Sequence, residues 1–312
     1  MMKKIMGIVL VLVLAGSSAA MAKEKLSLML DWFPNVDHLP VYVAAEKGYF
    51  ADHNLEVEII SPSETSDGLK LAASGVVDLA VSYEPQTIIA ADQGLDIKVV
   101  APLVVHPLTT LLFLKDSGIE TPIDLSGKKI GYTVPGLMDV LLDAFAQINK
   151  IRDYTPVNVG FTILPALAGG KVDAVMGPFK TYEVVTMASQ GVEAAFFELE
   201  KWGIPDYEEL IFICSKDTLE KKSASVKAFL SSLELAFAYV RAHPQDALKT
   251  YLSAVPEADK EIETLAFERT RPYFAVKSGH DLDKWQAFAD FALKYGLIKH
   301  KLNAETLIHN WQ

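Results

Sequence analysis

Short apolar runs alternate with amphipathic segments along most of the chain. The apolar runs predict β-strands over residues 25–30, 55–60, 78–82, 97–105 and 129–132. Between them, apolar residues recur at helical spacing, which predicts helices over residues 40–50, 65–74, 85–93 and 137–148, the first of which should end near Gly48. This alternation is typical of α/β folds, in which helices flank mostly parallel sheets.

One motif occurs twice in the sequence. Residues 73–82 read ASGVVDLAVS, and residues 168–177 read AGGKVDAVMG. In both copies we expect the glycine to cap a helix, the aspartate (Asp78 or Asp173) to open the next turn, and the apolar residues to enter a sheet. Chance similarity between common turns is the alternative, but the repeat favours two lobes of related topology.

A second pair of similar segments indicates how the lobes are connected. Residues 109–118 (TTLLFLKDSG) and 209–218 (ELIFICSKDT) each contain an apolar strand followed by Lys-Asp and a turn. If the first takes the chain into lobe two and the second brings it back, the pair forms a two-strand hinge. We therefore expect an α/β protein whose lobes each contain a mostly parallel sheet flanked by helices, with lobe one formed by residues 23–108 and 215–312 and lobe two by residues 109–214.

The C-terminal part of the chain is predicted to be mostly helical. Residues 223–242 carry apolar side chains close to helical spacing, and Pro244 follows the expected end of this helix. We expect the later helices to pack back on lobe one.

Residues 1–22 have the layout of a secretory signal peptide. Two lysines precede an apolar run over residues 5–16, and residues 20–22 (Ala-Met-Ala) form a small-x-small cleavage site. Ser17 stands where a lipoprotein would carry its cysteine, and no later stretch is long and apolar enough to cross a bilayer. The sequence therefore predicts a periplasmic protein that is neither a lipoprotein nor inserted in the membrane; an uncleaved anchor is the alternative.

Composition and charge narrow the class of protein further. The chain has 312 residues, half of them hydrophobic, which is enough for about two domains. Its formal net charge of −11 argues against nucleic-acid binding, because phosphates are repelled. Cys214 is the single cysteine, so an internal disulfide is impossible, and its apolar strand predicts a buried, inert thiol.

The common catalytic motifs are absent from the sequence. It contains no G-x-S-x-G, no Walker loop, no G-x-G-x-x-G and no H-E-x-x-H, and its seven histidines lie singly along the chain. We therefore expect no catalytic residues, no cofactor and no metal ion.

Candidate ligand-binding residues follow the predicted strands, because ligands of open α/β sheets bind outside the carboxyl ends of strands. These residues are Trp32, Asn35, His38, Ser82, Tyr83, Gly136, Phe179, Tyr182 and Glu183. Some have structural alternatives: Asn35 suits a turn after Pro34, His38 suits a helix cap, and Glu183 suits the first turn of a helix. Asp31 is as suited to holding the loop as to touching a ligand.

The candidate set is rich in aromatic rings and carboxylates and contains no arginine. The four arginines of the chain lie elsewhere, at Arg152, Arg241, Arg269 and Arg271. A sulfonate or phosphate ligand usually requires guanidinium groups or several helix-terminal amides. Rings that stack and carboxylates that accept N–H protons instead fit a flat, nitrogen-rich ligand.

Residues 28–60 (LMLDWFPNVDHLPVYVAAEKGYFADHNLEVEII) resemble the NMT1/THI5-like family of periplasmic substrate-binding proteins. The matching features are L-D-W-x-P-N, a histidine before the helix, and A-x-x-K-G-Y-F. The resemblance continues through residues 74–85, 124–136 and 169–183 and so covers most of the chain. The first and last segments are specific, whereas the middle two also occur in nitrate-, taurine- and alkanesulfonate-binding relatives.

The resemblance implies a type II periplasmic binding protein fold and a monomer that delivers a small molecule to an ABC importer, consisting of a permease and its ATPase. Bacterial members of the family bind thiamin pyrimidine precursors of the formylaminopyrimidine or hydroxymethylpyrimidine type, held by aromatic rings and a glutamate. Matched by position, Trp32 and Phe179 resemble the stacking aromatics, Asn35 the loop asparagine and Glu183 the glutamate.

Two departures from the family pattern leave the ligand's substituents open. Val36-Asp37 replaces the usual Thr-Asn, and Thr181-Tyr182-Glu183 stands where Asn-Phe-Glu is common. One alternative is a binding protein for an alkanesulfonate, riboflavin or an aromatic catabolite. Others are a pyrimidine-synthesising enzyme that uses His38, and a sensory or scaffold module. The fungal enzymes of the family have a cysteine-rich motif, which this chain lacks.

Overall fold

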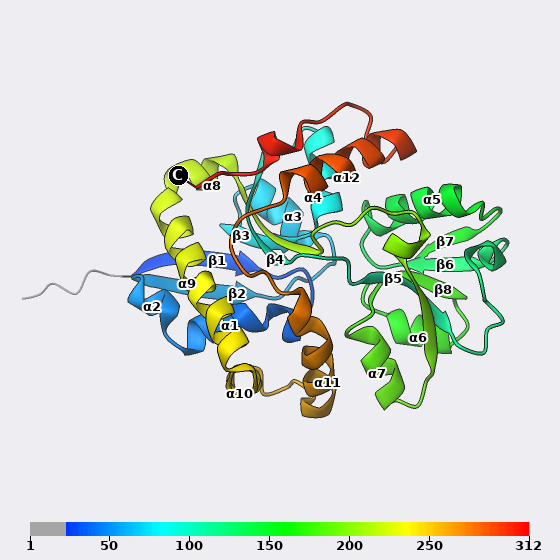
Figure 1. Cartoon of the computed structure of the whole chain (residues 1–312), viewed down its shortest axis with the longest axis horizontal. Coiled ribbons are helices and arrows are strands. Elements are labelled where there is room, and N and C mark those ends of the chain that lie inside the picture. Colours follow the sequence, from blue (N-terminus) through cyan, green and yellow to red (C-terminus); the bar gives the residue numbers. More distant parts are fainter. Residues whose placement is uncertain (1–22, 312) are drawn as a thin grey trace, which may run out of the picture.

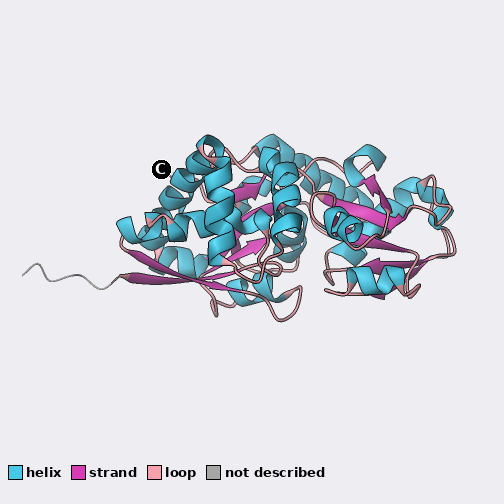
Figure 2. Cartoon of the chain, turned by 90° about the horizontal axis from the view of Figure 1, so that it is seen from below, coloured by secondary structure: helices cyan, strands magenta, loops and turns pink. Residues whose placement is uncertain are grey.

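The computed structural model describes residues 23–311, so the predicted signal peptide lies outside the described part. Two five-stranded sheets lie side by side along the longest axis of the molecule (Figures 1 and 2). The first sheet has the order β2-β1-β3-β10-β4. Its strands are β1 (Glu24–Met29), β2 (Leu55–Ile60), β3 (Leu79–Ser82), β4 (Ile97–Val104) and β10 (Leu210–Ser215).

The second sheet repeats this arrangement with the order β7-β6-β8-β5-β9. Its strands are β5 (Thr109–Leu114), β6 (Lys129–Tyr132), β7 (Thr155–Asn158), β8 (Ala174–Phe179) and β9 (Ala194–Glu198). In each sheet the second strand in the order pairs in parallel with both neighbours, and the fourth strand, β10 or β5, pairs antiparallel with both. The predicted α/β fold with two related sheets is confirmed. The chain passes from the first sheet to the second directly before β5, and it returns to the first sheet directly before β10.

The two copies of the repeated motif have the same structural role. Asp78 accepts a hydrogen bond from Ser27 N (2.9 Å), and Asp173 accepts one from Lys129 N (2.8 Å). Each aspartate therefore ties the strand that follows it to the neighbouring parallel strand, β1 or β6. This is a more specific role than opening a turn, because each carboxylate satisfies a backbone donor of the adjacent strand.

Helices cover both faces of each sheet, and α5 lies across the second sheet from α6 and α7 (Figure 1). The helices are α1 (Leu39–Glu46), α2 (Tyr49–Asp52), α3 (Asp67–Ala73), α4 (Glu84–Asp92), α5 (Met138–Asn149), α6 (Ile163–Ala168), α7 (Glu183–Ser189), α8 (Lys216–Lys221), α9 (Ser223–Ala242), α10 (Pro244–Ala254), α11 (Lys260–Thr270) and α12 (Leu282–Tyr295). Five 3-10 helices complete the described part: η1 (Val36–His38), η2 (Pro122–Leu125), η3 (Leu199–Trp202), η4 (Arg271–Tyr273) and η5 (Ala304–Leu307).

One local prediction is confirmed and one was wrong. The helix expected over residues 40–50 does end near Gly48, because a φ of +79° there is incompatible with a continuous right-handed helix, and the short helix α2 follows. The turn expected after Lys216-Asp217 is instead part of α8, because the Ser215 side chain accepts from Thr218 N and caps a helix there.

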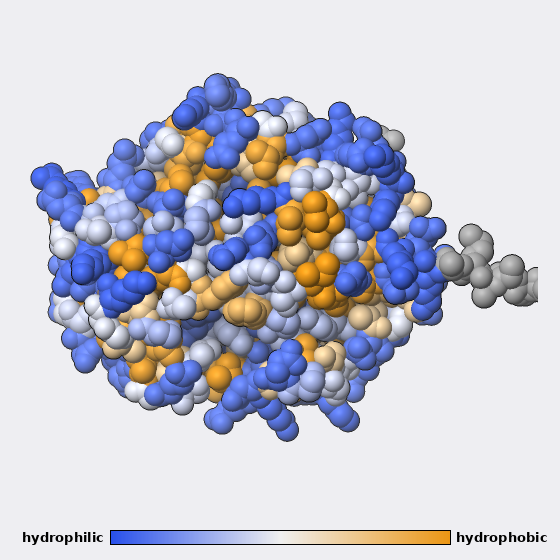
Figure 3. Space-filling view, turned by 180° about the vertical axis from the view of Figure 1, so that it is seen from behind, coloured by the Kyte–Doolittle hydropathy of each residue, from blue (hydrophilic) through white to orange (hydrophobic). Residues whose placement is uncertain are grey.

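The C-terminal helices pack mainly on the first sheet's half of the molecule, as expected: α10 contacts α1 and α9, and α12 contacts α4. In addition, α11 reaches α7 beside the second sheet. Within residues 23–311, no helix has the length and apolar character needed to span a membrane. Figure 3 shows one face of the molecule, on which hydrophobic residues form separate groups among hydrophilic ones.

A buried carboxylate joins the two crossing segments between the sheets. Glu209 lies directly before β10, and its Oε2 accepts from Leu108 N (2.5 Å) and Thr109 N (2.7 Å) at the start of β5. Its Oε1 accepts from Thr109 Oγ1 (2.8 Å). Burial raises the pKa of Glu209 to about 7, against the lowering effect of these hydrogen bonds. The two crossings are therefore held together by side-chain bonds in addition to strand pairing.

Glu209→Gln is expected to destabilise the fold by about 1–3 kcal/mol, because an amide cannot accept from all three donors and leaves a buried N–H group unpaired. Urea unfolding measures this loss. Glu120→Gln is the matched control, since Glu120 is exposed. Equal stability of the two variants would show that the hydrogen bonds of Glu209 do not stabilise the fold.

Candidate ligand-binding site

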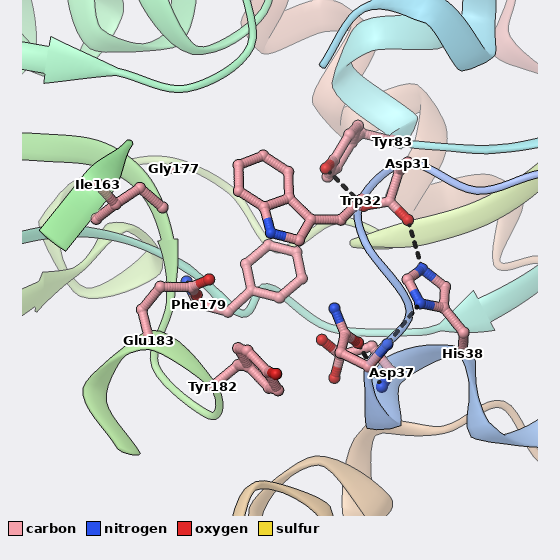
Figure 4. A pocket seen from close by; sticks show the side chains of 11 residues that line it. Asp31, Trp32, Asp37, His38, Tyr83, Ile163, Gly177, Phe179, Tyr182 and Glu183 are labelled. Carbon is pink, nitrogen blue, oxygen red and sulfur yellow. Dashed lines mark hydrogen bonds and ion pairs between the residues drawn. The ribbon is translucent and has the colours of Figure 1, made fainter. Parts of the chain in front are cut away.

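A narrow cavity of about 20 Å³ lies between the two halves of the molecule, where β1, β3 and β8 end (Figure 4). Its walls come from both halves. The lining residues are Asp31, Trp32, Asn35, Asp37, His38, Tyr83, Ile163, Gly177, Phe179, Tyr182 and Glu183. The carboxyl ends of the strands thus meet at the position predicted for a ligand.

The structure brings most of the predicted site residues to this cavity. Trp32, Asn35, His38, Tyr83, Phe179, Tyr182 and Glu183 line it.

Ser82 and Gly136 do not line the cavity. Ser82 is buried at the end of β3 and donates to Gln86 Oε1 (3.0 Å). Gly136 has a φ of +80°, and its N–H donates to Asp139 Oδ1 (2.7 Å) in the first turn of α5. Both residues bond to the start of a helix. From the sequence alone, a residue after a strand can equally be a ligand contact or part of a helix start.

A buried carboxylate fixes the loop that follows β1. Asp31 Oδ2 accepts from the Tyr83 hydroxyl (2.7 Å), and Asp31 Oδ1 lies 2.8 Å from His38 Nε2. All three side chains are buried. The polar ends of Tyr83 and His38 are therefore used to position the loop, and Figure 4 shows both directed at Asp31.

Asn35 also holds the loop. Its Oδ1 accepts from Asp37 N (2.8 Å), and its Nδ2 donates to Phe33 O (3.2 Å). Its own N–H is directed at His38 Nδ1 (3.4 Å), which completes the cap of η1. The turn alternative stated for Asn35 is thus observed, while the residue still lines the cavity.

The aromatic contacts include one ring that the sequence analysis missed. Trp32 packs edge-to-face on Phe161, with ring centroids 4.6 Å apart, and Phe161 also lies 4.6 Å from Phe33. Phe161 follows β7, a strand that was not predicted because its sequence contains Pro156 and its side chains are mostly exposed. The contact joins the loop after β1 to the second sheet.

Glu183 is the first residue of α7 and faces the cavity. Its Oε2 accepts from Phe179 N (2.7 Å), so the carboxylate keeps unused acceptor capacity. Burial raises the pKa of Glu183 to about 7, opposed by its backbone hydrogen bonds.

Asp37 lies in the loop after β1 and was not among the predicted site residues, but it lines the same cavity. Its Oδ1 accepts from Thr270 Oγ1 (2.9 Å) at the end of α11. Burial raises the pKa of Asp37 to about 7, although His38 lowers it. The sequence did offer a signal for Asp37, because it is an acidic residue in the loop that follows a predicted strand.

Glu263 on α11 links the two halves beside the cavity. Its Oε2 accepts from Val36 N (2.9 Å), and its Oε1 accepts from the Tyr182 hydroxyl (2.8 Å). Burial raises the pKa of Glu263 to about 7. A further bond runs from Thr65 Oγ1 to Thr133 O (2.8 Å).

Gly177 lines the cavity at a position where only glycine fits. Its φ is +124°, and a Cβ would lie 2.0 Å from Thr133 Oγ1. Ile163, at the start of α6, supplies the apolar wall beside it. Sequence reasoning had no signal for Ile163, because one apolar residue at a helix start is ordinary.

The electrostatic character of the cavity is acidic. Among residues 23–311, no lysine or arginine lines it, whereas Asp31, Asp37 and Glu183 do. Such a wall offers hydrogen-bond acceptors to a ligand that brings donors, and it repels anions.

Residues 35–247 match the family model described as NMT1/THI5 like. The chain belongs to this family. A Haemophilus influenzae protein named for thiamine biosynthesis is 40% identical over 90% of each chain. The formylaminopyrimidine-binding protein of Halalkalibacterium halodurans is 29% identical, over 91% of this chain and 89% of its own. A 4-amino-5-hydroxymethyl-2-methylpyrimidine phosphate synthase of Saccharomyces cerevisiae is 31% identical, over 89% of this chain and 85% of its own.

Solved structures confirm the periplasmic binding protein fold. The alkanesulfonate-binding protein of Xanthomonas axonopodis pv. citri, bound to MOPS, superimposes with a TM-score of 0.72 and 17% identity. The match covers 92% of this chain and 99% of that one.

The stability of the ligand-free protein is expected to fall as the pH rises from about 4 to about 7. Asp37, Glu183, Glu209 and Glu263 have pKa values of about 7 in the folded protein, against 3.8 or 4.5 for the free side chains. The folded state therefore binds more protons than the unfolded state in this interval, and stability is lost as these carboxyls ionise.

Urea unfolding at about pH 5, 6, 7 and 8 tests this dependence. Glu183→Gln should make the decline shallower, because it removes one of the four groups. A free energy of unfolding that rises across the interval would contradict the assignment.

Proposed function

We propose that this protein captures a thiamin-related pyrimidine, of the formylaminopyrimidine or hydroxymethylpyrimidine type, and delivers it to an ABC importer. The observation that carries the proposal is the cavity itself. Aromatic side chains and a buried glutamate meet there, and no lysine or arginine of the described residues lines it. A flat ring with amino hydrogens complements these walls.

In the proposed complex the ring lies between Trp32 and a second aromatic side chain. Trp32 contributes from the loop after β1, and Phe179 or Tyr83 contributes the opposing face. Glu183 accepts the amino hydrogens of the pyrimidine, since its carboxylate has acceptor capacity beyond the bond from Phe179 N. Burial of these groups strengthens each hydrogen bond by excluding water.

Asn35 and His38 act mainly by positioning the loop. The amide of Asn35 and both ring nitrogens of His38 face partners within the loop or on Asp31. They therefore fix where Trp32 presents its ring.

Closure of two lobes over the ligand follows from the connections between the sheets. Lobe one (residues 23–108 and 215–312) and lobe two (residues 109–214) are joined through the crossings before β5 and before β10, and bending there would open the cavity. The bond between Tyr182 and Glu263 would hold the closed form, because its partners come from different lobes.

The transport role places the mature protein in the periplasm as a monomer, after cleavage of residues 1–22. Its partners are the small-molecule ligand and the permease with its ATPase. The supporting observations are the signal-like sequence and the fold shared with solute-binding proteins.

The rival functions fit the cavity less well. An alkanesulfonate would meet three carboxyls and no lysine or arginine of the described residues. Yeast relatives are named synthases, but His38 in this chain is fully buried and its Nε2 lies 2.8 Å from Asp31 Oδ1, which suits a positioning role better than chemistry. We therefore assign binding without catalysis.

Titration with 4-amino-5-hydroxymethyl-2-methylpyrimidine, followed by tryptophan fluorescence, tests the function. We expect saturable binding well below millimolar, with an alkanesulfonate and riboflavin as comparison ligands. Failure of the pyrimidine to bind, or tighter binding of a comparison ligand, would contradict the proposal.

Glu183→Gln is expected to weaken pyrimidine binding by about tenfold or more, because the amide presents a donor to the ligand's amino group. Calorimetry measures the change. Glu46→Gln, at the end of α1 and outside the cavity lining, is the control and should retain wild-type affinity. Unchanged affinity of Glu183→Gln would remove this residue from the site.

A further inference from the structure

Asp37 has a buried oxygen without a partner. The residue is 1% exposed, and its Oδ2 has no hydrogen-bond partner among the described residues. Its other oxygen accepts only from the neutral hydroxyl of Thr270. A buried carboxylate oxygen left unpaired is costly, so this position requires an explanation beyond loop structure.

The other carboxylates that line the cavity differ from Asp37 in this respect. Asp31 uses one oxygen toward Tyr83 and the other toward His38. Glu183 accepts from the backbone of Phe179. Asp37 alone among these three has a buried oxygen that no protein group satisfies.

The wall of the cavity supplies no lysine or arginine to Asp37. The compensating group in the wall is His38, which lowers the pKa of Asp37 but directs its Nε2 at Asp31. Asp31 and Glu183 raise the pKa of Asp37 further, after burial, because like charges disfavour its ionised form. A positive group from outside the protein would offset both effects.

We infer that the ligand carries a cationic amino group that binds Asp37 Oδ2, in addition to the ring amino group that faces Glu183. The inference rests on the proposed function, a thiamin-related aminopyrimidine in this cavity, and replaces its uncharged formylamino or hydroxymethyl substituent by one that bears an ammonium. Figure 4 shows Asp37 and Glu183 on opposite sides of the cavity, so one ligand presents a donor to each. An ammonium supplies both hydrogen bonds and charge, whereas a hydroxyl supplies a hydrogen bond alone.

Two nearly isosteric probes separate these possibilities. They are 4-amino-5-aminomethyl-2-methylpyrimidine, which carries an ammonium near neutral pH, and its 5-hydroxymethyl counterpart, which is uncharged there. We expect wild-type protein to bind the aminomethyl compound about tenfold more tightly or better. Asp37→Asn should abolish this preference while retaining affinity for the hydroxymethyl compound. Asp52→Asn, an equal charge change on the exposed end of α2, should leave the preference intact.

The outcomes distinguish this inference from the proposed function. If both compounds bind wild-type protein with equal affinity, or if Asp37→Asn keeps the preference, the inference is overturned and the pyrimidine function stands. If neither compound binds, the proposed function fails. Thermal unfolding shows whether Asp37→Asn folds, and if it does not, the wild-type affinity ratio alone decides.

Discussion

The site depends first on the buried carboxylate of Asp31. It receives the Tyr83 hydroxyl from the end of β3 and faces His38 at the end of the loop, so three segments are fixed at one point. Because these groups are shielded from water, each hydrogen bond is expensive to break. These bonds hold the loop after β1 in place, with Trp32 at the cavity between the two halves of the molecule.

Buried carboxylates also join the two halves at two places. Glu209 joins the crossing segments, and Glu263 joins the Val36 backbone to Tyr182. Buried carboxylates serve here as acceptors for backbone and hydroxyl donors without pairing with lysine or arginine. The result is a cavity whose unused acceptor capacity faces inward, at Glu183 and Asp37, which is the complement of the donor-rich ligand that we propose.

Much of the fold was predictable because its signals are local. The strand and helix periods, and the aspartate of the repeat, are read within about ten residues, and they led to two related sheets. The aromatic and acidic positions after β1 and β8 were predictable for the same reason. Phe161, Glu263 and Thr270 were not, because they reach the loop after β1 from far along the chain. Ser82 and Gly136 were misplaced, since a strand end or a tight turn also begins a helix.

The most direct measurement of the central claim is a crystal structure of the protein with an aminopyrimidine of the thiamin type. The account predicts the ring in the cavity between Trp32 and Phe179 or Tyr83, with its amino nitrogen about 3 Å from Glu183. A pyrimidine bound outside this cavity, or one whose amino group points away from Glu183, would contradict it.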